Sequence, residues 1–217
     1  MEEFFMGPKN ARFCLVQPVN EPEAALLQQE FSLITAACGD DVCLAAFLVR
    51  DWNGDLSPWP AAPVFGKVGF AGRARQTLQE LERRFLPQLA HRYLSQPEAV
   101  RYVIGGYSLA GLFSLWAASE TDHFAACAAA SPSVWFPGWI DYARSHRLQT
   151  GAVYLSLGDR EEKTRNPVMG RVGDCIRQQA DILKDRLVIL EWNKGNHFVD
   201  SEKRTARAFS WCVAQLR

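Results

Sequence analysis

Ser108 lies in the segment Gly-Tyr-Ser-Leu-Ala-Gly at residues 106–111, where small residues flank it on both sides. Residues 100–104 are β-branched and aromatic, and residues 112–118 have helix-forming composition without a breaker. A strand, a sharp turn and a helix are therefore predicted, which is the signature of a nucleophile elbow. Such a turn strains the serine backbone and leaves room only for small side chains two residues before and after it. An ordinary glycine-rich turn is the alternative.

A serine hydroxyl must lose its proton as it attacks, so it needs a base within hydrogen-bond reach, usually a histidine. The chain has four histidines. His91 and His146 fall on or near predicted helices, and His123 lies in a polar helix-to-strand turn. His197 instead follows a predicted strand, in a turn to which Gly195 gives backbone freedom. His197 is the predicted base; an ordinary surface-loop histidine is the alternative.

A third group, an acid, would hold the imidazole in the correct tautomer and stabilise its cation. Three carboxylates, Asp159, Glu161 and Glu162, crowd the turn after the predicted strand at 152–157. Glu161 is the preferred acid because it follows Gly158 at the spacing common in such turns. Asp159 is expected to begin the turn by bonding to backbone amides. Any one of the three carboxylates could instead be a solvated loop charge.

The negative charge that develops on a substrate during attack needs backbone donors, an oxyanion hole. The N–H of Leu109 is free at the start of the predicted elbow helix, at the positive end of its dipole. A second donor is expected in the loop after the predicted strand at 42–49, from Trp52 or Asn53. An apolar substrate pocket, with Trp135 as the chosen substrate-binding residue, is predicted from nearby aromatic residues, which are Trp52, Trp59, Phe65 and Trp135.

These groups need a scaffold, and strands alternate with helices along the whole chain. Strands are predicted at 11–18, 42–49, 100–104, 124–130, 152–157 and 186–191, the second of them at the sheet centre. Helices are predicted at 21–37, from Thr77 with a kink or break at Pro87, after the elbow, around 168–183 and from Ser201. This alternation predicts an α/β domain with a mostly parallel sheet, at whose carboxyl edge Ser108, Glu161 and His197 would meet. The long segment 50–72 follows the predicted strand at 42–49 and is rich in proline and glycine. It is expected to be functional or mobile.

Composition limits the classes of protein to which the chain can belong. With 217 residues, 48% hydrophobic and 22% charged, one globular domain over 1–217 is expected. Twenty-four basic and twenty-four acidic residues cancel, which disfavours nucleic acid and anionic membranes as partners. Neither a spanning stretch nor a secretory signal is evident, so a cytoplasmic protein is expected. Six scattered cysteines are interpreted as reduced core residues rather than disulfides or zinc ligands.

The sequence resembles α/β-hydrolase esterases of the esterase-D and enterochelin-esterase type, from about Ala45 to the C-terminus. The resemblance is carried by Phe-Leu-Pro at 85–87, the elbow at 106–113, Ser-Pro-Ser-Val-Trp at 131–135 and Gly-Asn-His at 195–197. It implies an α/β-hydrolase fold, with a nucleophile at Ser108, a base at His197 and an acid in the turn at 158–162. The chain departs from the family in having Ala110 where glycine is usual. Its short first forty residues suggest a trimmed sheet without extra N-terminal strands or a lid domain.

Together these observations predict a serine esterase that cleaves small-molecule carboxylic esters through an acyl-enzyme, with neither cofactor nor metal. A thioesterase or peptidase would use the same residues. A hydrolase fold kept as a non-catalytic binding module, with serine and histidine not assembled, is the alternative from another class. Phosphate-directed chemistry at the elbow helix is disfavoured because neither a Walker lysine nor a metal-binding carboxylate cluster accompanies it. The physiological ester and the oligomeric state do not follow from the sequence.

Overall fold

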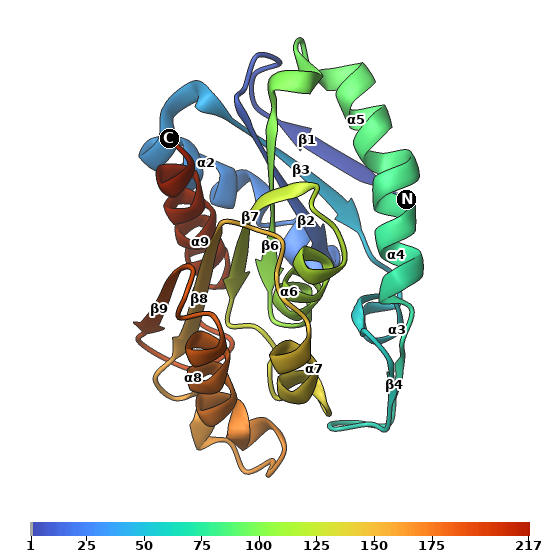
Figure 1. Ribbon diagram of the computed structural model, residues 1–217, viewed down its shortest axis with the longest axis vertical. Helices are drawn as coiled ribbons and strands as arrows, with labels where there is room; N and C mark the ends of the chain where they lie inside the picture. The colour runs from blue at the N-terminus through green and yellow to red at the C-terminus, as the bar shows by residue number, and fades with distance from the viewer. Residues whose placement is uncertain (1) are drawn as a thin grey trace.

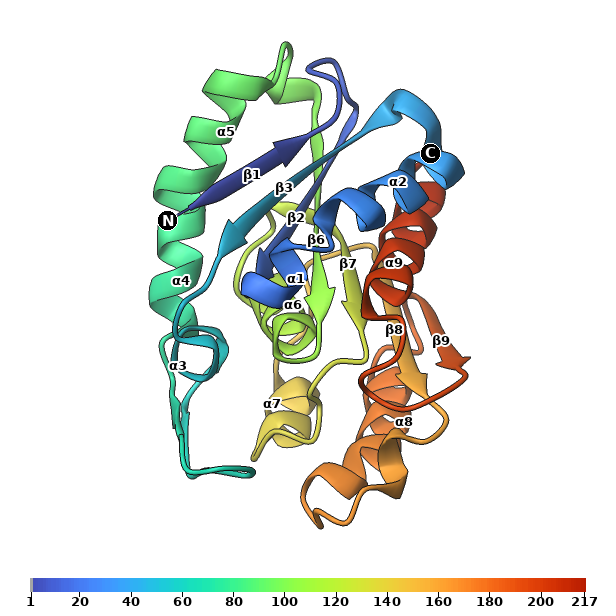
Figure 2. The same cartoon turned by 180° about the vertical axis from the view of Figure 1, so that it is seen from behind.

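The computed structural model describes residues 2–217, which form a seven-stranded sheet with helices on both faces (Figures 1 and 2). The strand order is β1-β3-β2-β6-β7-β8-β9, and every neighbouring pair is parallel except β1 with β3. The strands are β1 (Glu3–Met6), β2 (Phe13–Val19), β3 (Val42–Leu48), β6 (Arg101–Tyr107), β7 (Phe124–Ala130), β8 (Ala152–Gly158) and β9 (Leu187–Asn193). A separate two-stranded ribbon pairs β4 (Pro60–Ala61) with β5 (Phe70–Ala71).

The interior strands have apolar residues on both faces because helices cover both. Every residue of β2 is buried, and β7, with the sequence Phe-Ala-Ala-Cys-Ala-Ala-Ala, is buried at all but one position. Such unbroken apolar runs are typical of parallel strands inside an α/β sheet. The small side chains of β7 let α6 (Leu109–Glu120) and α9 (Ser201–Leu216) pack close to the sheet from opposite sides.

Two apolar cores lie on the two faces of the sheet. One core is covered by α4 (Ala74–Glu80), α5 (Leu86–Tyr93), α6, α7 (Trp139–Ser145) and α8 (Val172–Ile182). The other is covered by α2 (Leu27–Cys38) and α9, which lie in front of the sheet in Figure 2. The six cysteines of the sequence are all buried, as expected, and carry free thiols.

Several sequence predictions are confirmed. A strand occupies 124–130, the strands at 42–49, 152–157 and 186–191 are offset by at most two residues, and α9 begins at Ser201. The fold is the predicted mostly parallel α/β sheet. The predicted central place of β3 is wrong: it is second from one edge, and β6 is the middle strand. β3 is nevertheless buried because β1 covers its outer side.

The expectation of a sheet without extra N-terminal strands is also wrong. β1 adds an antiparallel edge strand, in which Phe4 pairs with Ala46 and Phe5 with Ala45. With four residues it is too short to give a clear alternating pattern. The predicted helix at 21–37 is divided into α1 (Glu21–Ala24) and α2.

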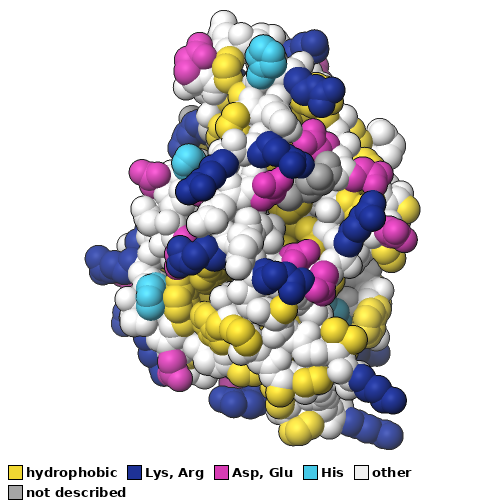
Figure 3. Space-filling model, turned by 90° about the vertical axis from the view of Figure 1, so that its right-hand side faces the viewer, with side chains coloured by type: hydrophobic (Ala, Val, Ile, Leu, Met, Phe, Trp, Pro, Cys, Tyr) yellow, Lys and Arg dark blue, Asp and Glu magenta, His cyan; other side chains and the backbone are white. Residues whose placement is uncertain are grey.

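The helix expected to kink at Pro87 continues through a widened turn. A π-helical segment, Leu81–Phe85, joins α4 to α5, and the N–H of Leu86 bonds to the carbonyl of Leu81. This register change ends just before Pro87, which has no N–H to donate. The joined helices run along the β1 edge of the sheet (Figure 1). Figure 3 shows this side of the molecule, where basic and acidic side chains are interspersed.

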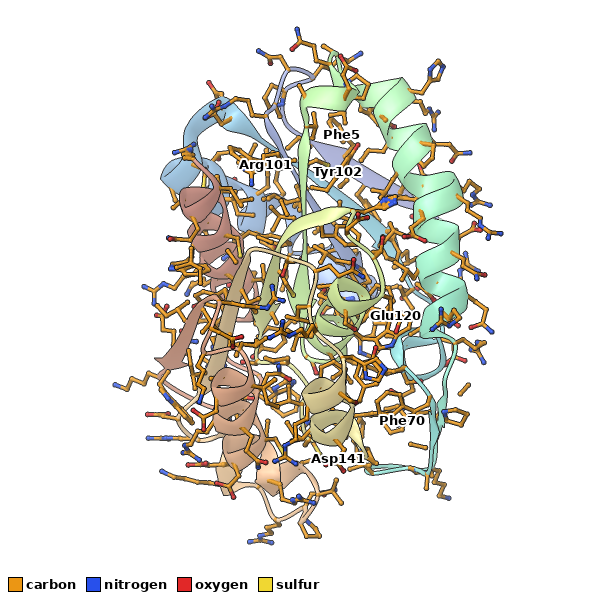
Figure 4. All side chains as sticks on the ribbon, viewed as in Figure 1. Phe5, Phe70, Arg101, Tyr102, Glu120 and Asp141 are labelled. Atoms are coloured by element: carbon orange, nitrogen blue, oxygen red, sulfur yellow. The ribbon has the colours of Figure 1, made fainter. Side chains whose placement is uncertain are left out.

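Segment 50–72 is more ordered than the sequence suggests. It contains α3 (Trp52–Leu56) and the β4–β5 ribbon, which extends beyond the carboxyl edge of the sheet (Figure 1). Phe70, labelled in Figure 4, lies on the side of this ribbon that faces α7, with its ring 5.1 Å from that of Phe136. Among residues 2–217, the helices are all too short or too polar to cross a bilayer.

Candidate active site

Ser108 lies between β6 and α6 with backbone angles φ 58° and ψ −121°, a conformation that costs an L-residue free energy. Two backbone hydrogen bonds, to the last residue of β7 and to the loop after it, hold Ser108 in this conformation. The Ser108 N–H donates to the Ala130 carbonyl at 3.1 Å, and the Ser133 N–H donates to the Ser108 carbonyl at 3.0 Å. This is the sharp strand-to-helix turn that the sequence predicts, and it projects the hydroxyl beyond the edge of the sheet.

Close approach of the chain explains the small residues around the elbow. A Cβ on Gly106 would lie 2.6 Å from the Cβ of Ala110, and a Cβ on Gly111 would lie 3.0 Å from the Gly106 carbonyl oxygen. Ala110 therefore fits because residue 106 lacks a side chain. The methyl group of Ala110 fills the space that glycine at 106 leaves.

His197 comes from the turn between β9 and α9 and contacts both of its predicted partners. Its Nε2 lies 2.9 Å from Ser108 Oγ, and its Nδ1 lies 2.7 Å from Glu161 Oε2. The His197 side chain is 25% exposed, whereas that of Glu161 is 4% exposed. A hydroxyl, an imidazole and a buried carboxylate thus form one hydrogen-bonded chain that opens to solvent at the serine.

The other two carboxylates of the acid turn have different partners. Asp159 Oδ1 accepts the Gly195 N–H at 2.9 Å, a backbone amide of the histidine turn. Glu162 Oε2 lies 3.3 Å from the guanidinium of Arg177 on α8. Of the three candidates, Glu161 is therefore the one that contacts His197.

Glu161 is held ionised by its surroundings. Its Oε1 accepts hydrogen bonds from the Gly158 N–H at 2.7 Å and the Ser131 hydroxyl at 2.8 Å. Burial alone would raise the pKa of this carboxyl. The hydrogen bond and charge of His197, with the two donors on Oε1, outweigh burial and hold the pKa below its ordinary value. At neutral pH the charge is therefore available to orient His197.

Sequence reasoning missed a second layer of this site. Arg204, on α9, lies 3.0 Å from Glu161 Oε1 and 3.1 Å from the Tyr107 hydroxyl. That hydroxyl donates to the His197 carbonyl at 2.9 Å. Burial, followed by the negative charge of Glu161, raises the pKa of Tyr107 to about 12, which keeps this donor protonated. Ser133, whose hydroxyl lies 3.4 Å from Ser108 Oγ, was also missed.

The predicted oxyanion donors lie around the same opening. Leu109 is the first residue of α6, and Trp52 and Asn53 are the first two of α3. N–H groups in a first helical turn have no partner within the helix. The Asp51 carboxylate caps α3 by accepting the Gly54 N–H, further along that turn, at 3.1 Å. All three predicted donor residues line the cleft that contains Ser108.

The cleft has a volume of about 800 Å³, and Ser108, Glu161 and His197 are among the residues that line it. Aromatic residues form much of the remaining wall, and they are Trp52, Phe65, Phe70, Trp135 and Phe198. Phe65 and Phe70 both meet Trp135 edge-on, with ring centroids 6.4 and 6.3 Å apart.

One aromatic prediction is wrong. Trp59 does not line this cleft in the described chain: its Nε1 donates to the Pro137 carbonyl at 2.8 Å, and its ring packs on Phe136 and Tyr142. Two cations that the sequence reasoning passed over, Arg160 and Lys163, do line it. Within residues 2–217, no three His, Cys, Asp or Glu side chains are grouped so that they could hold a metal ion.

The fold and its serine elbow define an α/β hydrolase. Residues 55–210 match the family model described as "Putative esterase", which is well over half of the chain. The protein belongs to this esterase family and is an esterase. No curated protein matches the sequence.

Solved structures share the fold at low sequence identity. An IroE-like serine hydrolase from Shewanella oneidensis is 15% identical, with a TM-score of 0.77 over 96% of this chain and 74% of that one. The siderophore hydrolase EstA from Aspergillus nidulans is 18% identical, with a TM-score of 0.69 over 95% and 84%. The enterobactin esterase FES from Shigella flexneri is 14% identical, with a TM-score of 0.71; this chain is covered to 99% but spans only 56% of FES.

Proposed function

We propose that this esterase cleaves carboxylic esters through an acyl-enzyme, with Ser108 as nucleophile, His197 as general base and Glu161 as the orienting acid. The observation that carries the proposal is the unbroken chain from Ser108 Oγ through His197 to Glu161 Oε2, with distances of 2.9 and 2.7 Å. The strained backbone of Ser108 supports it, because such strain is retained where a function needs it.

In the first half of the reaction, Ser108 Oγ attacks the ester carbonyl carbon while its proton passes to His197 Nε2. The carbonyl oxygen becomes an oxyanion, for which the Leu109 N–H and an N–H of Trp52 or Asn53 are the proposed donors. Glu161, ionised at neutral pH, stabilises the imidazolium. Collapse breaks the bond to the alkoxy oxygen, which leaves as an alcohol with the proton from His197.

In the second half, water replaces the alcohol. His197 removes a proton from this water as its oxygen attacks the acyl carbon, and a second oxyanion forms at the same donors. Collapse returns the proton to Ser108 Oγ and releases the carboxylic acid. Each half therefore begins and ends with a neutral imidazole, and atoms balance without a cofactor.

The cleft supports an ester with a bulky, partly aromatic body. Its volume of about 800 Å³ lies toward the upper end of the usual range for small-molecule sites. Phe65 and Trp135 offer ring faces and edges, and Arg160 and Lys163 offer positive charge to an anionic substituent. Because similar folds include proteins described as siderophore hydrolases and an enterobactin esterase, aromatic siderophore esters belong in the first substrate panel.

A fluorophosphonate probe and a panel of p-nitrophenyl esters test the proposal. We expect wild-type protein to be labelled at Ser108, as located by mass spectrometry, and to hydrolyse short esters. Ser108→Ala should lose both properties while keeping its fold. Folded wild-type protein that takes no label and hydrolyses none of the esters would contradict the proposal and favour a binding module.

A thioesterase or peptidase would use the same groups. The residues that line the cleft favour neither activity. Thioester and amide analogues of the best ester, compared by kcat/KM, therefore decide between the two.

We also propose a cytoplasmic location, which the burial of all six free thiols supports. Cell fractionation with an antibody to the chain tests it.

A further inference from the structure

Arg204 is the most extensively bonded buried charge near the site. Its side chain is 3% exposed, and its guanidinium contacts the ends of two strands and both turns that carry the acid and the histidine. Nη1 contacts Glu161 Oε1 at 3.0 Å, while Nη2 donates to the Lys194 and Asn196 carbonyls at 3.2 and 3.1 Å. Nη1 also contacts the Tyr107 hydroxyl at 3.1 Å and the Ser131 hydroxyl at 3.3 Å.

These contacts determine where Glu161 and His197 lie relative to each other. By occupying Oε1, Arg204 leaves Oε2 of Glu161 to face His197. By bonding to the Lys194 and Asn196 carbonyls of the histidine turn, it fixes the backbone just before His197. Through the Tyr107 hydroxyl, it also fixes the His197 carbonyl. The Arg204 guanidinium thus orients the Glu161 carboxylate, the backbone of the histidine turn and, through Tyr107, the His197 carbonyl.

Two neighbouring cations on α9 show that this arrangement is specific to Arg204. Lys203 is 55% exposed and pairs with Asp200, and Arg207 is 61% exposed and pairs with Glu191. A buried ion pair is often no more stabilising than apolar residues of similar volume. A merely structural role would therefore be served by an apolar side chain, whereas directing Glu161 and two carbonyls at once needs the forked donor of arginine.

We propose that Arg204 is a positioning residue of the esterase reaction, which holds the acid and the histidine turn in register. The inference rests on the proposed function of Ser108, Glu161 and His197.

Arg204→Met tests the proposal against Arg207→Met, a matched change at an exposed position of the same helix. With p-nitrophenyl butyrate at neutral pH, we expect Arg204→Met to lower kcat by about 10²-fold with little change in KM, since small misplacements of catalytic groups have effects of this size. Arg207→Met should retain the wild-type kcat.

Arg204→Lys and Tyr107→Phe keep the proposal testable if Arg204→Met does not fold. Lysine keeps the charge but not the forked donor of arginine, so kcat should fall by about tenfold, less than in Arg204→Met. Tyr107→Phe removes only the link to the His197 carbonyl and should lower kcat by a smaller factor. Folded Arg204→Met with wild-type kcat, or Arg204→Lys with wild-type kcat, overturns the proposal.

Fluorophosphonate labelling separates this inference from the function on which it rests. If wild-type protein is labelled at Ser108 and folded Arg204→Met is labelled equally fast, only the role of Arg204 is rejected. If wild-type protein is neither labelled nor active on esters, the proposed function fails and the role of Arg204 fails with it. Slower labelling of Arg204→Met, with Arg207→Met unchanged, supports both.

Discussion

The two walls of the cleft are built in different ways. The wall with Ser108, Glu161 and His197, here called the reaction wall, is a hydrogen-bonded network supplied by the ends of β6 and β7, the acid turn, the histidine turn and α9. The part of the cleft lined by Trp52, Phe65, Phe70 and Trp135 is called the aromatic wall. It is carried largely by segment 50–72, in which Asp55 forms a partly exposed ion pair with Arg73 at 2.9 Å.

This difference separates two tasks. Bond breaking needs groups held to within fractions of an ångström, which buried, fully bonded polar groups provide. Substrate selection needs apolar area of suitable shape, which tolerates adjustment. Changes in the reaction wall should therefore reduce turnover for every ester, while changes in the aromatic wall should alter the preference among esters.

The largest effect is expected from Ser108→Ala. Loss of the nucleophile removes the acyl-enzyme route and should lower kcat by roughly 10⁶-fold for small and bulky esters alike. Steady-state assays on p-nitrophenyl acetate and p-nitrophenyl benzoate measure it, with circular dichroism to confirm folding. Residual turnover above one per cent of wild type would show that another group attacks the ester.

Glu161→Gln should lower kcat by about 10⁴-fold at neutral pH, because an amide neither stabilises the imidazolium nor fixes the productive tautomer. The loss should be similar for acetate and benzoate esters. Equal activity of Glu161→Gln and wild type would show that a serine–histidine pair suffices.

The same variant tests the charge of Glu161 through stability. Because the folded-state pKa lies below the ordinary value of 4.5, the ionised carboxylate stabilises the fold above about pH 4.5. That contribution is lost as pH falls through the lower pKa of the folded protein. Urea unfolding should therefore show the stability difference between wild type and Glu161→Gln shrinking below pH 4.5. A difference that is constant from pH 7 to below the folded pKa would contradict this.

Gly106→Ala should destabilise the reaction wall through packing. The new methyl group would lie 2.6 Å from the Cβ of Ala110, and such overpacking typically costs about 1–3 kcal/mol. Ala110→Gly removes the opposing methyl, so the double variant should recover the part of the loss that comes from this clash, while the strain of alanine at φ 157° remains. Thermal unfolding of both single variants and the double variant measures this coupling, and additive effects would show that the two positions do not clash.

A smaller and selective effect is expected from Phe65→Ala in the aromatic wall. Phe65 is 51% exposed, so its loss should leave the fold intact. The KM for p-nitrophenyl benzoate should rise by roughly fivefold, about 1 kcal/mol, while that for p-nitrophenyl acetate stays constant. Val68→Ala is the control, because Val68 is exposed on the same segment and does not line the cleft. Equal effects on both esters would argue against a role in selection.

Arg73→Met should have the smallest effect. Its guanidinium pairs with Asp51 and Asp55 on the surface, where ion pairs contribute little and are screened by salt. We expect a small fall in the Tm that disappears at 1 M salt and an unchanged kcat. A large loss of kcat would mean that segment 50–72 is held as firmly as the reaction wall.

Sequence reasoning reached six of the seven strands of the main sheet, and it pointed to Ser108, His197 and the turn that holds Glu161, because each of these has a local signal. Ser108 is marked by small neighbours between a strand and a helix, and His197 by its glycine-containing turn. Glu161 was one of three carboxylates, and only the fold distinguishes it: Asp159 bonds to Gly195 and Glu162 to Arg177. Their catalytic roles remain predictions that the experiments above test.

Other features have no local signal. In the sequence, Arg204 resembles Lys203 and Arg207, and its burial depends on where α9 meets the ends of β6 and β7. Trp59 and Trp135 are equally aromatic, yet tertiary packing directs one to Tyr142 and the other to the cleft. Strand order likewise depends on pairing between distant segments, which is why β3 was misplaced.

The docking of α9 has a consequence for how activity is acquired. This helix packs against α2 and against β6, β7 and β8, and it carries the guanidinium that bonds to the acid turn. A refolding chain in which the sheet has formed but α9 is still detached would possess its serine yet lack an ordered histidine turn. Recovery of ester hydrolysis after dilution from urea should therefore report the docking of the final helix.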